Sequence, residues 1–148
     1  MNTVALREHF MVLYPEQDRR ANVQGCWNWF DTDNGRAQAE VALIMAAIDQ
    51  VCAEHPADPA RVAIAGMSAG ASMAALVATH HPQRFVALGM HSGIATGVAH
   101  SSFSAMLALL GQRTPQPLAV TPECMATSWP ALLVIHGEAD MLVSPRNG

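Results

Sequence analysis

The sequence is poor in charged residues, aromatic residues and cysteine. Charged residues make up 14% and aromatic residues 5% of its 148 positions, and the net charge is −4 with no run of Lys or Arg. Proteins that bind nucleic acid or an anionic membrane carry basic patches, so the sequence predicts neither partner. No apolar stretch reaches the roughly 18 residues that a membrane span needs. The first ten residues lack the apolar core of a signal peptide, so we expect no export signal within them.

The three cysteines, Cys26, Cys52 and Cys124, have a spacing that matches no zinc or redox motif. Cys52 falls on the apolar face of a predicted helix, which favours a buried thiol. Cys26 lies in a loop, and the odd number of cysteines leaves open a partner outside this chain.

Apolar residues, by contrast, occupy 51% of the positions. A chain of this length and composition forms one domain with its own core. Continuous apolar runs are typical of strands buried on both faces, and here they alternate with segments of helical periodicity. This alternation predicts an α/β fold with a mostly parallel sheet and helices on both faces. The predicted strands are residues 10–14, 62–65, 85–90 and 131–135, and the predicted helices are residues 35–54, 70–80 and 101–110.

Two details of the predicted helices concern their surfaces. In the helix at 101–110, the spacing predicts a buried side made of Phe103, Met106, Leu107 and Leu110. At the end of the helix at 70–80, His80 and His81 are expected to be solvated and to suit the negative end of the helix dipole.

Residues 66–70, GMSAG, lie between a predicted strand and a predicted helix. Strand, G-x-S-x-G, helix is the layout in which a serine hydroxyl is exposed on a strained turn, so Ser68 is a candidate nucleophile. The Ala69 N–H at the helix N-terminus is a candidate oxyanion donor. We expect Gly66 and Gly70 both to be required, because a Cβ there would collide with the neighbouring strand or helix. A plain Gly-rich turn is the alternative.

A nucleophilic serine needs a base and a carboxylate that orients the base. Asp140 follows the predicted strand at 131–135 and suits the carboxylate, although a turn residue or helix cap is the alternative. In α/β-hydrolases the histidine comes last along the chain, but all seven histidines precede Asp140. His136 is expected to order the loop rather than act as the base. His91 and His100 stay open as weaker candidates for the base, close enough to the cleft to contact substrate.

Truncation explains the missing histidine better than substitution does. An open parallel sheet of this kind needs more strands than the sequence predicts, and the chain stops directly after a site loop. It also begins almost at a strand, without the earlier loop that supplies the second oxyanion N–H. We therefore expect residues 1–148 to be a single partial domain.

With these residues in hand, the sequence resembles the polyhydroxybutyrate depolymerase family of α/β-hydrolase esterases. The resemblance implies an incomplete α/β-hydrolase fold, with Ser68 as nucleophile and Asp140 as triad acid. The family's upstream His-Gly-Cys loop and its C-terminal histidine are absent. Because members often keep a cysteine in that upstream loop, the resemblance implies that Cys26 is a candidate for a disulfide whose other cysteine is missing here. The motifs that carry the resemblance are VLYPEQ at 12–17, CWNWF at 26–30, DPARVAIAGMSAGASMAA at 58–75, HSG at 91–93 and HGEADMLVSPRNG at 136–148.

The resemblance also implies an activity. The expected function is a serine carboxylesterase that acts through an acyl-enzyme on poly(3-hydroxyalkanoate) or short-chain esters, with no metal or organic cofactor. Feruloyl or acetyl-xylan esterase activity is the alternative within this class, and a catalytically inactive fragment is the alternative of another class. The partner is then a small or polymeric ester. The location is extracellular by resemblance, with cytoplasmic as the alternative, and the oligomeric state is not predicted.

Trp27 and Trp29 are the remaining candidates, together with His91. All three are expected to contact substrate. For the two tryptophans, a local hydrophobic plug in a polar loop is the alternative to the wall of a binding cleft.

Overall fold

The computed structural model describes residues 1–116 and 128–147, so Cys124 lies outside the described residues. No helix of the described part is long and apolar enough to cross a membrane. In chain order the elements are α1 (Asn2–Arg7), α2 (Arg36–Glu54), β1 (Ala63–Met67), α3 (Ala69–His80), η1 (Pro82–Arg84), β2 (Ala87–His91), α4 (Ser102–Leu109), β3 (Ala131–Ile135) and η2 (Pro145–Asn147).

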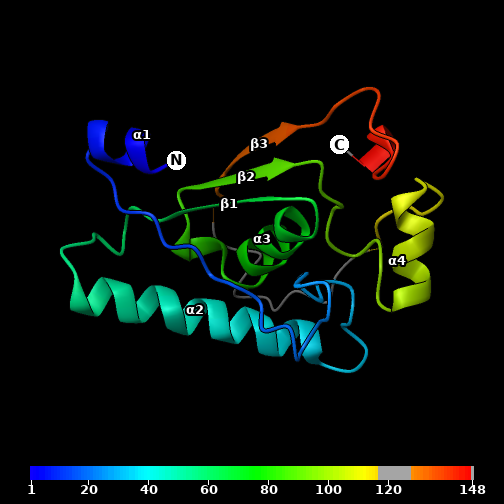
Figure 1. Cartoon of the computed structure of the whole chain (residues 1–148), viewed down its shortest axis with the longest axis horizontal. Coiled ribbons are helices and arrows are strands. Elements are labelled where there is room, and N and C mark those ends of the chain that lie inside the picture. The colour runs from blue at the N-terminus through cyan, green and yellow to red at the C-terminus, as the bar shows by residue number, and fades with distance from the viewer. Residues whose placement is uncertain (117–127, 148) are drawn as a thin grey trace.

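The strands β1, β2 and β3 form one parallel sheet in that order. Met67 at the end of β1 pairs with His91, and His91 pairs with Ile135 at the end of β3. The three arrows lie side by side in Figure 1. Because the strands are parallel, their carboxyl ends meet at one edge of the sheet. The loops that follow them carry Ser68 and Asp140.

The helix α3 lies between the sheet and α2 (Figure 1), and it packs against β1 and β2. Residues 71–79 of α3 are all buried, since the sheet covers one side of this helix and α2 another. The amphipathic helix α2 buries Val41, Ile44 and Met45. These layers confirm the predicted α/β fold, the apolar face of α2 and three of the predicted strands.

The sheet is open at β3. All five residues of β3 are exposed, including Leu132 and Leu133 at 62% and 60% of their surface. Among the described helices, α3 makes the main contacts with the sheet. The predicted helical cover is therefore seen on the α3 side of β1 and β2, and it does not extend over β3.

The prediction of a strand at residues 10–14 is wrong. This segment contains no strand and stays outside the three-stranded sheet. Phe10 donates its backbone N–H to Ala5 rather than to a neighbouring strand, and the Tyr14 side chain is 60% exposed. A continuous apolar run becomes a strand only where another strand supplies a hydrogen-bonding edge, and here none of the described strands does.

The predicted buried side of α4 is also wrong. The helix buries its small residues Ser104, Ala105 and Ala108. Of these, Ala105 and Ala108 pack with Ile94 and Val143 in a second apolar cluster. The small side chains allow α4 to approach that cluster closely. As a result, Phe103, Met106 and Leu110 are exposed, and Leu107 is half-buried.

Candidate active site

Ser68 stands on a strained turn between β1 and α3. Its backbone has φ 53° and ψ −124°, a conformation that non-glycine residues rarely adopt and that costs on the order of 1–3 kcal/mol. Its N–H donates to the carbonyl oxygen of His91 at 2.9 Å, which continues the β1–β2 ladder up to the turn. The strain is therefore held in place by the sheet on one side and by the first turn of α3 on the other.

The two glycines of the motif are not equivalent. A Cβ on Gly66 would collide with the backbone carbonyl of Gly70, and it would lie 2.6 Å from the Ala71 nitrogen. A Cβ on Gly70 would meet nothing within 4 Å. The prediction that both glycines are required is thus confirmed for Gly66 and wrong for Gly70, because the tight approach is made by the backbone of Gly70 and not by its α-hydrogens.

A second tie holds the turn to the loop after β2. Ser72, on the first turn of α3, is 2% exposed. Its hydroxyl accepts the Ile94 N–H at 2.8 Å and lies 3.4 Å from the Ser68 carbonyl oxygen. A buried N–H without such a partner is costly, so this bond anchors the loop after β2 on α3.

Ala69 is the first residue of α3. The N–H groups of the first helical turn have no acceptor in a preceding turn, and the helix dipole adds positive potential there. The Ala69 N–H is thus suited to bind a developing oxyanion beside Ser68.

A cavity of about 260 Å³ opens beside Ser68. Ser68 and Ala69 form one side of it, and Trp27 and Trp29 line it together with apolar residues of α4 and of the loop after β3. Trp29 also packs edge-on against Phe30, with ring centroids 5.7 Å apart. The lining is completed by Asn22, Gln24, Cys26, Phe30, Ser72, Ser92, Ile94, Ala105, Leu109 and Val143.

Asp140 lies in the loop after β3, where one oxygen, Oδ1, accepts the N–H groups of Leu142 and Val143 at 2.9 Å each. These two bonds, that from Val143 first, hold the pKa of the Asp140 carboxyl below its usual 3.8. Removal from water acts in the opposite direction, while the Ser92 hydroxyl and the neighbouring His136 add to the lowering of the pKa. Asp140 is therefore a carboxylate at neutral pH, as a group that orients a histidine must be.

His136 holds this loop together. Its Nε2 lies 2.9 Å from the Val143 carbonyl oxygen and 3.6 Å from Asp140 Oδ2. Because a carbonyl can only accept, Nε2 carries the proton and donates it. The expected ordering role is therefore seen, and Nε2 is engaged within the loop rather than aimed at Ser68.

The other candidate histidines lie apart from the cavity. His91 is the last residue of β2, and its side chain is exposed. Since Met90 before it is buried against the core, His91 faces the opposite side of the sheet. His100 pairs through Nδ1 with Asp33 at 3.1 Å. Neither lines the cavity, so the geometry does not support the prediction that His91 binds substrate.

Comparisons with known proteins agree with this architecture. The family described as esterase PHB depolymerase matches residues 1–148. The chain belongs to that family. Poly(3-hydroxyalkanoate) depolymerase C of Paucimonas lemoignei is 31% identical over 145 residues, which cover 93% of this chain and 35% of the relative.

Other relatives are acetylxylan and feruloyl esterases by name. Acetylxylan esterase A of Aspergillus awamori is 24% identical over 98% of this chain and 51% of its own length, and feruloyl esterase B of Neurospora crassa is 29% identical over 93% and 50%. The solved acetyl xylan esterase from Aspergillus awamori superposes with a TM-score of 0.58 at 22% identity, over 83% of this chain and 50% of that one. That likeness supports the α/β-hydrolase fold. This member of the PHB depolymerase family spans about half or less of the length of these relatives.

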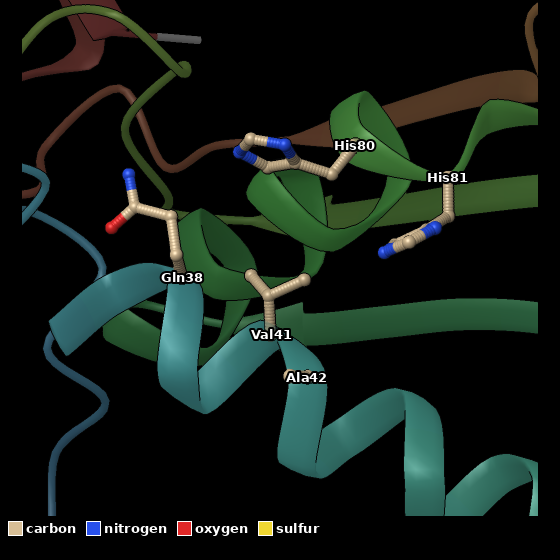
Figure 2. A pocket seen from close by; sticks show the side chains of 5 residues that line it. All are labelled: Gln38, Val41, Ala42, His80 and His81. Carbon is tan, nitrogen blue, oxygen red and sulfur yellow. The ribbon is translucent and has the colours of Figure 1, made fainter. Parts of the chain in front are cut away.

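A second hollow lies between α2 and the end of α3, lined by Gln38, Val41 and Ala42 of α2 and by His80 and His81 (Figure 2). Burial lowers the pKa of both imidazoles, and the charge of His81 on His80, and of Arg84 on His81, lowers them further. The expectation of a solvated pair is confirmed for His80, which is exposed, and wrong for His81, which is half-buried where α2 covers the end of α3. Within the described residues, no group of three or more His, Cys, Asp or Glu side chains is placed to hold a metal ion.

Sequence reasoning missed two residues near the cavity. Ser92 adopts φ 49°, and its hydroxyl helps to lower the pKa of Asp140. Nothing in the letters HSG indicates that conformation. Glu40 is 4% exposed and accepts hydrogen bonds from Gln17 and Asn28. The sequence does contain one indication that Glu40 is buried, because this residue lies one helical turn before Ile44, on the apolar side of α2.

Proposed function

We propose that this chain carries the nucleophile and the acid of a serine carboxylesterase. The observation that supports the proposal best is Ser68, held at positive φ on the turn into α3 and exposed to a cavity of about 260 Å³. Asp140, ionised and held by its own loop, is the acid. Such a constellation is typical of the α/β-hydrolase fold to which the chain belongs.

The reaction follows from these groups. Ser68 Oγ attacks the ester carbonyl carbon while its proton passes to a histidine, and the Ala69 N–H stabilises the negative oxygen that forms. The bond from carbon to the alcohol oxygen breaks, and the alcohol leaves with the proton. Water then attacks the acyl-enzyme, a second proton passes through the same histidine, and the carboxylic acid and free Ser68 are restored. Asp140 stabilises the histidine in its charged form.

The histidine base in this proposal is not one of the seven in the chain. None of them lines the cavity that contains Ser68, and His136 and His100 are bonded to other groups. We infer that a residue outside these 148 positions supplies the base.

The proposed substrate is a carboxylic ester with a short acyl group. The cavity has a mostly apolar lining with two tryptophans, which suits an aliphatic acyl chain such as that of a 3-hydroxyalkanoate. The depolymerase relative at 31% identity favours the polymeric ester, while the acetylxylan and feruloyl esterase relatives support an aromatic or acetyl ester as the second candidate. The proposal includes no cofactor and an extracellular place of action.

The test compares Ser68→Ala with the matched control Ser102→Ala, an exposed serine on α4. Both are introduced into the 148-residue chain and into the product of the complete reading frame, wherever it begins and ends. Hydrolysis of p-nitrophenyl butyrate and labelling of Ser68 by a fluorophosphonate are measured.

In the complete product, Ser68→Ala is expected to abolish both signals and Ser102→Ala to leave them unchanged. The 148-residue chain is expected to show no Ser68-dependent hydrolysis, because loss of the base costs a factor on the order of 10⁶ in a serine hydrolase. Ser68-dependent hydrolysis by the short chain would place the base at His91, His100 or His136. A complete product without hydrolysis would favour the inactive alternative.

A further inference from the structure

A buried carboxylate, Glu40, lies behind the aromatic side of the cavity. It projects from the first turns of α2 and is 4% exposed. One of its oxygens, Oε2, accepts the backbone N–H of Asn28 at 2.7 Å. The other, Oε1, accepts the Asn28 side-chain amide at 2.6 Å and the Gln17 side-chain amide at 2.7 Å. A buried charge is tolerated where hydrogen bonds replace its hydration, as they do here.

This network joins the two motifs that the esterase chemistry leaves unexplained. Gln17 closes the YPEQ motif and Asn28 is the centre of CWNWF. Gln17 also lies 3.4 Å from the Cys26 carbonyl oxygen, and Asn22 donates its amide to Asn28 Oδ1 at 3.0 Å. Segments far apart in sequence therefore converge on one carboxylate of α2.

The bonds to Asn28 fix the chain between the two tryptophans. Asn28 is 3% exposed, with both its backbone N–H and its side chain bound to Glu40. Trp27 and Trp29 on either side of it line the cavity that contains Ser68. Both indoles also pack against the core formed by α2 and α3. Because Trp27 and Trp29 are the direct chain neighbours of Asn28, any movement of Asn28 would move them.

We propose that Glu40 is a positioning residue that, through Asn28 and Gln17, sets the place of Trp27 and Trp29 in the cavity wall and thereby the acyl group that the cavity accepts. The part that concerns the acyl group rests on the proposed esterase function. Glu40 itself lies outside the cavity lining, so it acts through the tryptophans and not on the substrate.

The donors around Glu40 require a carboxylate. All three groups that face its oxygens are N–H donors. In Glu40→Gln, one oxygen becomes an NH₂ group that faces a donor, so at least one buried N–H loses its acceptor while the shape of the side chain is kept. Combining Glu40→Gln with Asn28→Asp restores the bonds between these two positions, because the new carboxylate at position 28 accepts from the new amide at position 40 while the remaining oxygen accepts the backbone N–H. The Gln17 amide, which shares Oε1 with Asn28, stays without its acceptor in this variant.

Quenching is measured on the 148-residue chain with Trp129→Phe, in which the two remaining tryptophans are those of the cavity. The readouts are acrylamide quenching of tryptophan fluorescence in this chain, and KM and kcat for p-nitrophenyl butyrate in the product of the complete reading frame. The matched control is Glu54→Gln, on the same helix, where an exposed carboxylate accepts one side-chain amide, that of Gln50, at 2.9 Å. Circular dichroism reports whether each variant is folded.

Glu40→Gln is expected to raise the quenching constant of the tryptophans and to raise KM about tenfold with kcat nearly unchanged, since ground-state binding is what is lost. The exchange variant is expected to reverse most of both changes, and Glu54→Gln to cause neither. A role in stability alone would lower the unfolding midpoint but leave native-state quenching and KM unchanged, and that result would overturn the proposal.

A further variant covers the case in which Glu40→Gln does not fold. Gln17→Ala removes the outermost donor and leaves both bonds to Asn28, so a smaller rise in quenching and KM is expected, and no rise would contradict the proposal. Quenching is measured without turnover. If no ester is hydrolysed, the esterase assignment fails, while the positioning of Trp27 and Trp29 by Glu40 is still decided by the quenching constants.

Discussion

The two sides of the cavity are built in different ways. The elbow side, residues 66–72, takes its shape from a contact within one short motif, the approach of Gly66 to the backbone of Gly70. Bonds to His91 and Ile94 then tie it to the end of β2 and the loop after it. The aromatic side, residues 22–30, contains no helix or strand. Its position depends on Glu40, which comes later in the sequence and belongs to α2.

This difference decides what a change in each side does. A local turn with positive φ stores strain that the surrounding sheet and helix must balance. A loop held by a distant carboxylate stores no such strain, but its position depends on every donor being matched. Perturbations of the elbow are therefore expected to act on stability and chemistry together, and perturbations of the aromatic side mainly on binding.

The largest expected effect is that of Gly66→Ala. Its new Cβ would collide with backbone atoms of Gly70, which cannot move without unwinding the start of α3. We expect the free energy of unfolding to fall by about 3 kcal/mol or more, as overpacking against backbone does. The measurement is urea denaturation followed by circular dichroism.

Gly70→Ala is the matched control on the other side of Ser68. A Cβ there meets nothing within 4 Å, and alanine is favoured over glycine within a helix by roughly 0.5–1 kcal/mol. We expect this variant to be as stable as the original chain or slightly more so. Equal losses in the two variants would contradict the difference between the glycines and the local origin of the elbow.

A smaller effect of opposite sign is expected from Ser68→Gly. Glycine adopts φ 53° without steric cost, so the substitution releases the strain of the turn. Compared with Ser68→Ala, which keeps the Cβ and the strain, it is expected to raise the free energy of unfolding by about 1 kcal/mol. The comparison with alanine cancels the loss of the hydroxyl, and both midpoints are measured in urea. Equal stability of the two variants would mean that the turn holds no strain.

The same contrast explains how much the sequence predicts. The turn at residues 66–70 can be predicted because one short motif contains the residues that contact each other. Ser68 lies on the turn, Ala69 begins α3 and Gly66 makes the close approach, while the roles of Ser68 and Ala69 in catalysis stay predictions. The network around Glu40 joins residues 17, 28 and 40. No local pattern connects such positions, so the motifs YPEQ and CWNWF indicate the family but not their own role.

The errors in predicting the elements have the same origin. Apolar periodicity predicts a strand at residues 10–14 and a buried side on α4, but burial depends on which neighbours are present. In the structure, Ala105 and Ala108 rather than Phe103 meet the second apolar cluster. By contrast, α2, α3 and β1–β3 were predictable because the apolar pattern of each segment matches the surface that its neighbours bury in the structure.

The pKa of Asp140 depends both on its own loop, as in the elbow side, and on a residue distant in sequence, as in the aromatic side. The variant Ser92→Ala measures the contribution of the distant residue. Its own loop provides the two main bonds, from Val143 and Leu142, while the hydroxyl of Ser92, in the loop after β2, lowers the pKa of Asp140 further. Ser92→Ala removes that hydroxyl and keeps the Cβ at φ 49°. We expect the pKa of Asp140 to rise toward its usual 3.8 without reaching it, because the two local bonds remain.

The effect on stability follows from the sign of this shift. A carboxyl whose pKa is lower in the folded state contributes stability above its unfolded pKa, and that stability is lost as the pH falls through the folded pKa. Ser92→Ala is therefore expected to be slightly less stable at neutral pH and to lose less stability on acidification. The pKa is measured by ¹³C NMR titration of the Asp140 carboxyl, with Ser102→Ala as the control. An unchanged pKa would mean that the two backbone bonds in the loop of Asp140 lower its pKa without help from Ser92. A rise above 3.8 would mean that the distant hydroxyl of Ser92 has the larger effect on this pKa.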